Sequence, residues 1–210
     1  VSMGGTITTT KSRSDTPGTA SSVENEPYGS TLAPMLDEFP AAPEPTSATS
    51  ARNGAGFMPC QGLYYSPKNK RVKTALIATH YNVDFSEHYL AEFMATRGYG
   101  FLGWNTRFRG NEAFFLLEHA LIDIGAGVRW LKEYAGIEKI VILGNSGGGS
   151  LMGAYQSQAQ GVTMTPTPDF ELPEALYDLI PADLYVSLCA HSGRPEVLTS
   201  WLDPSITDET

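Results

Sequence analysis

Short apolar runs alternate with amphipathic segments over most of the chain from Phe57 onward. The runs rich in strand-forming residues lie at 57–67, 74–80, 100–107, 139–146 and 184–191. Helical spacing of apolar residues marks three other segments, 86–98, a long stretch that ends near Tyr134, and 148–160. Short buried strands that alternate with amphipathic helices are typical of α/β proteins. The pattern therefore predicts a mostly parallel sheet with helices on both faces.

The long central helix has the clearest pattern in the chain. Its apolar stripe recurs at alternating steps of four and three residues, at Leu117, Leu121, Ile124, Val128 and Leu131. This spacing keeps one face of a helix apolar for four turns. Gly136 is expected to end the segment.

Two stretches depart from the alternation. About half of residues 1–52 are Ser, Thr, Pro or Gly, which predicts a disordered, low-complexity tail before an α/β domain at 53–210. Its acidic residues do not suit a transit peptide, so whether the tail is a targeting segment stays open. Residues 161–182 contain four prolines. They are read either as a lid inserted over the carboxyl end of the sheet or as an ordinary surface connection.

The candidate chemistry lies where the run 139–146 ends. Gly144-Asn145-Ser146-Gly147-Gly148 is a G-x-S-x-G pattern between a strand-like and a helix-like segment. A strand that turns into a helix within about one residue strains the serine backbone, and glycine at 144 and 148 avoids collisions. The following helix directs backbone N–H groups at the hydroxyl. The alternative is a plain glycine-rich turn.

The glycine-rich segments do not fit either of two nucleotide-binding motifs. A phosphate-binding loop needs a lysine where "GNSGGGSL" has none. The segment "GYGFLG" at 98–103 precedes a strand, whereas a dinucleotide-binding motif follows one.

The strand, the "GNSGGG" turn and the helix, together with the earlier "TALIATHYN", resemble the α/β-hydrolase superfamily from about Phe57 onward. The resemblance implies a serine hydrolase that acts on an ester or another small acyl substrate, with no cofactor. Ser146 would be the nucleophile, and the N–H of Gly147 one oxyanion donor. The second donor would be the N–H of Tyr81 or Asn82, although the family usually has glycine where Tyr81 stands.

Four polar residues are expected at the carboxyl edge of the sheet. They are His80, Arg107, Ser146 and His191. His80 is read as a structural hydrogen-bonding group under the oxyanion loop. Arg107 is expected either to pair with Glu112, to cap a loop, or to anchor an acidic substrate group. All three of His80, Arg107 and His191 are candidates for the wall of the pocket.

His191 is the only histidine after Ser146. A carboxylate between them would complete the formal order serine, acid, histidine; the candidates are Asp169, Glu171, Glu174, Asp178 and Asp183. The resemblance instead implies an acid and a histidine after later strands, which are not seen here. The sequence is therefore interpreted as the N-terminal part of a longer hydrolase, with little activity alone. A catalytically silent module that binds a ligand or partner is the alternative.

Composition narrows the partners of the 210-residue chain. A net charge of −9 disfavours nucleic acid and anionic membranes as partners. No apolar run approaches the roughly 20 residues of a membrane span, and an intracellular, cytoplasmic location is expected. Cys189 is expected to be buried, while His88 and His119 are expected on helix surfaces. No metal site is predicted from the histidine spacing, and the oligomeric state is left open.

Overall fold

The computed structural model describes residues 28–33, 60–68, 70–110, 112–166 and 171–202. The strands within them are β1 (Tyr28–Ala33), β2 (Gln61–Pro67), β3 (Thr74–Ala78), β4 (Gly100–Asn105), β5 (Lys139–Asn145) and β6 (Leu184–Leu188). The α-helices are α2 (Ala91–Thr96), α3 (Leu117–Glu133), α4 (Gly148–Gln160) and α5 (Arg194–Leu202). Two short 3₁₀ helices are η2 (Glu112–Phe114) and η3 (Glu174–Asp178).

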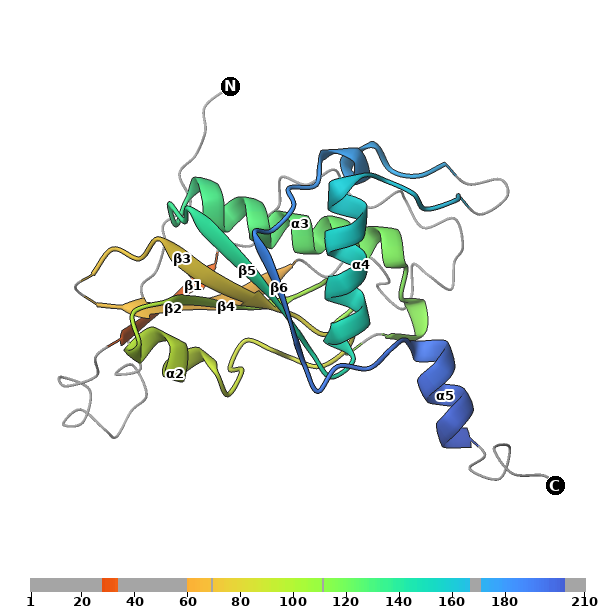
Figure 1. The fold of residues 1–210 in the computed structure, drawn as a ribbon, viewed down its shortest axis with the longest axis horizontal. Helices are drawn as coiled ribbons and strands as arrows, with labels where there is room; N and C mark the ends of the chain where they lie inside the picture. Colours follow the sequence, from red (N-terminus) through yellow and green to blue (C-terminus); the bar gives the residue numbers. More distant parts are fainter. Residues whose placement is uncertain (1–27, 34–59, 69, 111, 167–170, 203–210) are drawn as a thin grey trace.

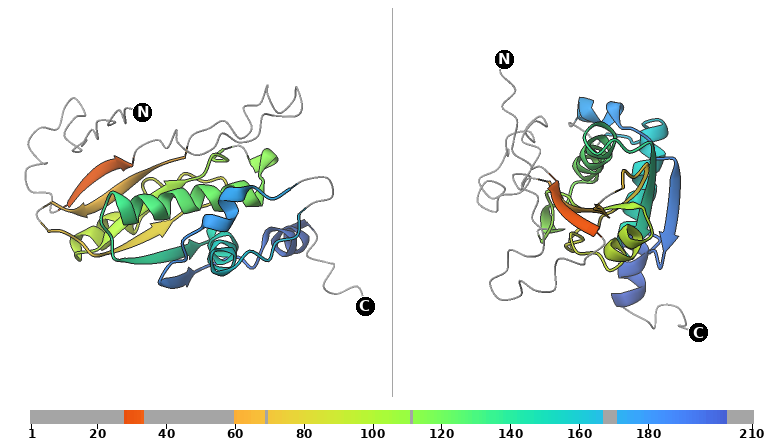
Figure 2. Two further views of the ribbon diagram at one scale, coloured as in Figure 1. Left: turned by 90° about the horizontal axis from the view of Figure 1, so that it is seen from above. Right: turned by 90° about the vertical axis from the view of Figure 1, so that its left-hand side faces the viewer.

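These strands form one sheet in the order β1-β2-β4-β3-β5-β6. The neighbours β4, β3, β5 and β6 run parallel, whereas β2 is antiparallel to both β1 and β4. Helices α3 and α4 cover one face of the sheet and α2 covers the other (Figures 1 and 2). The predicted fold class, a mostly parallel sheet with helices on both faces, is confirmed.

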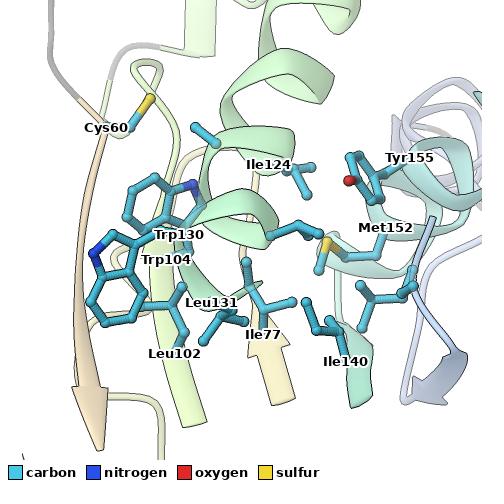
Figure 3. Close-up of a cluster of buried hydrophobic side chains, with 14 of the residues drawn as sticks. Cys60, Ile77, Leu102, Trp104, Ile124, Trp130, Leu131, Ile140, Met152 and Tyr155 are labelled. Carbon is cyan, nitrogen blue, oxygen red and sulfur yellow. The ribbon is translucent and has the colours of Figure 1, made fainter. Parts of the chain in front are cut away.

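The larger core lies between the sheet and helices α3 and α4. The stripe predicted on α3 faces it, because Leu121, Ile124, Val128 and Leu131 are all fully buried. Figure 3 shows residues of α3 above strand residues of β3, β4 and β5, beside Met152 and Tyr155 of α4. Gly127 permits this close approach, since a β-carbon there would lie 2.8 Å from Ile77 Cδ1. Alternation along the strands sends Leu76 and Phe101 to the opposite face, against α2.

Strand β1 lies within the segment that was predicted as a tail. Tyr28–Ala33 pairs with β2 in a register that runs from Tyr28 opposite Pro67 to Ala33 opposite Gly62. An edge strand can be held by backbone hydrogen bonds to a single neighbour, so it need not show the apolar alternation that the prediction used. The other residues of 1–52 lie outside the described residues.

The segment 161–182 packs on α3 and α4, apart from residues 167–170, which are not among those described. Leu176 of η3 is fully buried, and Tyr155 in the second half of α4 donates a 2.6 Å hydrogen bond to the carbonyl oxygen of Ile180. Asp178 pairs with Arg129 of α3 at 2.8 Å. These contacts lie toward the end of α4 that is remote from Gly148 (Figure 1). The described parts of the segment therefore do not cover the Gly148 end of the helix.

The prediction for Cys189 is wrong, because its side chain is exposed whereas Cys60 is buried. Cys189 directly follows β6, which is an edge strand of the sheet. Leu184 and Tyr185 of the same strand are 55% and 36% exposed. An apolar run at the edge of a sheet is therefore only partly covered by the described residues. None of the described helices is long and apolar enough to cross a bilayer.

Candidate active site

The chain reverses sharply between β5 and α4. Strand β5 ends at Asn145, Gly147 caps the next helix, and α4 begins at Gly148. Ser146 lies between them with φ of +54°, a left-handed conformation that is unfavourable for a residue with a β-carbon. Its side chain is half-buried. The strand thus turns into a helix across two residues, and we call Gly144–Gly148 the Ser146 turn.

Close contacts explain two glycines of the Ser146 turn. A β-carbon at Gly144 would come within 2.8 Å of both Gly149 Cα and the Tyr185 hydroxyl. A β-carbon at Gly148 would collide with the backbone carbonyl oxygen of Thr79, directly after β3. The spacing of glycine two residues before and after Ser146 therefore follows from the packing of the turn against its neighbours.

Backbone hydrogen bonds hold Ser146 to β6 and α4. Its N–H donates to the carbonyl oxygen of Leu188 at 3.3 Å. Its own carbonyl accepts from the N–H of Gly149 at 3.0 Å and from that of His191 at 2.9 Å. Among the described residues, none accepts a hydrogen bond from the Gly147 N–H or bonds to the Ser146 hydroxyl. The turn is therefore anchored through its backbone, with the hydroxyl and one amide left available.

His80 and Tyr81 lie over Gly147. The Nδ1 atom of His80 accepts hydrogen bonds from the N–H groups of Asn82 and Val83, both at 3.3 Å. The neutral ring therefore carries its proton on Nε2, which lies 2.7 Å from the place of a β-carbon on Gly147. Burial lowers the pKa of His80 below its ordinary value, against the opposite effect of the Asn82 hydrogen bond. The Tyr81 ring lies against His80, with centroids 4.3 Å apart.

No family model matches the chain, and no curated protein does. Solved structures are similar in part. Brefeldin A esterase, a bacterial homologue of human hormone-sensitive lipase, shares 17% identity over 49% of this chain and 32% of its own, with a TM-score of 0.42. A cold-adapted esterase from an Arctic intertidal metagenomic library shares 12% identity over 64% of this chain and 57% of its own, with a TM-score of 0.45. Dienelactone hydrolase from Anabaena variabilis shares 18% identity over 70% of this chain and 63% of its own, with a TM-score of 0.42.

The chain spans between 32% and 63% of the length of these three proteins. Identities and TM-scores this low carry no information on activity. The strand order and the left-handed serine between β5 and α4 are the telling features of this chain. The chain resembles the α/β-hydrolase superfamily in its fold.

Arg107 turns away from the edge of the sheet and toward α3. Its guanidinium donates to Asp123 from Nη2 at 2.6 Å and from Nε at 3.0 Å, and both side chains are buried. Burial acts to lower the pKa of Arg107, but the hydrogen bonds and charge of Asp123 raise it overall. The predicted pairing with Glu112 is wrong, because Arg107 pairs with Asp123 instead, and Glu112 accepts a hydrogen bond from the Asn82 amide.

His191 follows β6 on the same edge as Ser146 and His80. Its N–H bonds to the Ser146 carbonyl oxygen, and its ring meets Trp201 edge-on with centroids 5.8 Å apart. Among the described residues, no carboxylate lies within ion-pair distance of the His191 ring. The structure thus brings His80, Ser146 and His191 to one edge of the sheet without joining them by side-chain hydrogen bonds.

Two further histidines are buried, so the prediction that they lie on helix surfaces is wrong. His88 and His119 are each 7% exposed. His88 contacts Asn145 within the Ser146 turn, whereas Nδ1 of His119 has no hydrogen-bond partner among the described residues. No local sequence signal shows that these two histidines are buried. Within the described chain, no three His, Cys, Asp or Glu side chains are grouped to hold a metal ion.

The described surface also has a hollow of about 430 Å³ beside the start of β2. It is lined by Gln61, Gly62, Leu63, Asp84, Ser86 and Glu87. None of the residues predicted for the site lines it. The Ser146 turn therefore lies outside this hollow.

Proposed function

We propose that this chain carries the nucleophile of a serine hydrolase that acts on an ester or another small acyl compound. The observation that supports the proposal most is the left-handed backbone of Ser146 between β5 and α4. A non-glycine residue persists in this conformation only where its surroundings hold it there, and such strain is concentrated at functional sites. The strained Ser146 is thus the nucleophile of a nucleophile elbow.

In the proposed reaction, Ser146 Oγ attacks the acyl carbon and the carbonyl oxygen becomes negative. The N–H of Gly147, at the positive end of the α4 dipole, donates to this oxygen. The second donor that we propose is the N–H of Tyr81 or of Asn82, the latter of which also donates to His80 Nδ1 at 3.3 Å. Loss of one such donor typically lowers the rate roughly 100- to 1,000-fold.

The proton acceptor and its orienting carboxylate are proposed to lie outside the described residues. Asp178 pairs with Arg129, and Asp183 pairs with Lys139, so neither serves His191 here. We therefore propose that this chain alone has low hydrolytic activity. Slow attack by Ser146 remains, because the proposed oxyanion donors are in place and solvent can take the hydroxyl proton.

A fluorophosphonate probe tests the proposal directly, because it bonds covalently to the oxygen of a reactive serine, and slowly here because solvent takes the proton. We expect slow labelling at Ser146, located by mass spectrometry of the peptide that contains it. Ser146→Ala should abolish the label, while Ser150→Ala, which changes a serine in the first turn of α4, should keep it. An unlabelled Ser146 would contradict the proposal and favour a catalytically silent module that binds a ligand or partner.

A further inference from the structure

His88 is a buried histidine whose position has no explanation in the proposed reaction. It lies just before α2 and is 7% exposed. Its ring is stacked on Phe101 at 5.3 Å and on Tyr89 at 4.4 Å, and meets Phe85 edge-on at 4.8 Å. Packing fixes the ring plane, and the contacts of the two ring nitrogens select one of the two ring orientations.

Hydrogen bonds determine which nitrogen of His88 carries the proton. The N–H of Leu90 donates to Nδ1 at 3.2 Å, so Nδ1 is an acceptor without a proton. In the neutral ring the proton is therefore on Nε2, which lies 3.1 Å from the side-chain oxygen of Asn145. His88 thus donates to the residue immediately before Ser146.

The side chain of Asn145 also bonds to β6. Its Nδ2 donates to the carbonyl oxygen of Leu188 at 2.9 Å. The same carbonyl oxygen accepts the N–H of Ser146 at 3.3 Å. One polar chain therefore joins His88, the Asn145 amide and the acceptor that holds the Ser146 backbone.

Two residues beside the Leu188 carbonyl oxygen have a strained backbone. Ser146 has φ of +54°, and Cys189, directly after Leu188, has φ of +45°. Such conformations persist only where neighbouring groups hold them. The Asn145 amide fixes the separation of β5 and β6 at this point, and His88 fixes the orientation of that amide.

We propose that His88 is a positioning residue that acts through Asn145 to hold Ser146 in its reactive conformation. His88 does not contact the substrate or the reacting atoms. This role rests on the proposed function of Ser146. It also explains why a buried imidazole, which needs hydrogen bonds on both nitrogens, stands where an apolar side chain would fill the same space.

Two substitutions of similar size separate positioning from packing. His88→Gln keeps an N–H donor that can reach the Asn145 oxygen, whereas His88→Leu removes it. The readout is the second-order rate constant for fluorophosphonate labelling of Ser146. We expect His88→Leu to lower it about 10- to 100-fold, the scale of a small misplacement of a reacting group. We expect His88→Gln to recover most of the loss.

His119 supplies the matched control, because it is buried to the same extent and makes no hydrogen bond to the Ser146 turn. His119→Leu and His119→Gln should leave the labelling rate unchanged, whatever their effect on the melting temperature. If His88→Leu labels at the wild-type rate while its melting temperature falls, His88 only packs the core and the positioning role is wrong.

Nuclear magnetic resonance tests the hydrogen-bond chain without any activity. Long-range ¹H–¹⁵N correlations should show His88 with its proton on Nε2, and Asn145→Ala should shift that signal. A proton on Nδ1 would overturn the proposal even if Ser146 reacts. If the wild-type chain is not labelled at Ser146 at all, the proposed function fails, and the positioning role fails with it.

Discussion

The aromatic ring of Tyr81 lies directly over Gly147, so closely that a β-carbon on Gly147 would collide with Tyr81 Cε1. The same β-carbon would lie 2.7 Å from Nε2 of His80. The loop after β3 and the start of α4 are therefore in contact at the residue whose amide is the proposed oxyanion donor. Glycine at 147 is required by this contact.

Gly147→Ala should therefore displace the Tyr81 ring and the loop that carries it. We expect a loss of about 1–3 kcal/mol in the free energy of unfolding, the usual cost of overpacking. Fluorophosphonate labelling of Ser146 should fall on the order of 100-fold, since a small misplacement of a reacting group has that effect. Urea denaturation and timed labelling measure the two quantities.

Gly153→Ala is the control for this experiment, because it makes the same change inside α4. The nearest atom to its β-carbon would be the Tyr185 hydroxyl oxygen at 4.0 Å, so there is room. Alanine is preferred over glycine in a helix by about 1 kcal/mol, and we expect a stability gain of up to that size with unchanged labelling. Equal losses for the two variants would contradict the contact between Tyr81 and Gly147.

The elements that the sequence predicted well are those whose signal is local. The apolar stripe of α3 and the runs that became β3 and β5 appear in any short window of the chain. The side-chain pairings that the sequence did not reveal join residues that lie far apart in the chain. His88 is buried because the side-chain oxygen of Asn145, 57 residues later, accepts a hydrogen bond from its ring. Arg107 is buried because Asp123 on α3 neutralises its charge. Pairings of this kind depend on the assembled fold, so periodicity alone does not reveal them.

The ion pair between Arg107 and Asp123 should be essential for stability. Asp123→Asn would leave the buried guanidinium without its counter-charge. Breaking a buried pair from one side typically costs about 3–5 kcal/mol. We expect a loss of that size in urea denaturation. Lys73→Gln, which breaks the exposed pair of Lys73 with Glu138, should change the stability little, since surface pairs are weak. A small effect of Asp123→Asn would contradict the buried pair.

Acid should destabilise the fold through its buried histidines. Burial lowers the pKa of His80, His88 and His119 below the ordinary value of 6.5. As the pH falls below that value, these histidines take up protons in the unfolded chain before they do so in the folded one. The unfolded state is then favoured, and stability falls until the folded histidines also become protonated.

His119→Gln isolates one contribution to this pH dependence. The variant removes one titrating group, so its stability should depend less steeply on pH just below 6.5, by up to about 1.4 kcal/mol per pH unit. Urea denaturation at a series of pH values measures the slope in both proteins. An unchanged slope would mean that His119 titrates alike in the folded and unfolded chains, against its buried position.

The two cysteines should react at very different rates. Cys189 is exposed after β6, whereas Cys60 is buried and packs into the larger core. Burial raises the pKa of the Cys60 thiol, and the nearby negative charge of Asp123 raises it further. Alkylating reagents react with the thiolate, so both access and ionisation disfavour Cys60. We expect iodoacetamide at pH 8 to modify Cys189 in the folded protein and Cys60 only in denaturant.

Peptide mass spectrometry at successive times distinguishes the two sites. In Cys189→Ser, the remaining reaction at Cys60 should follow the unfolding of the core, and its rate should rise with urea concentration. Asp123→Asn should accelerate it in the absence of urea, because the variant both loosens the core and removes the charge that opposes the thiolate. Equal modification of both cysteines in the folded chain would contradict the burial of Cys60 in the larger core.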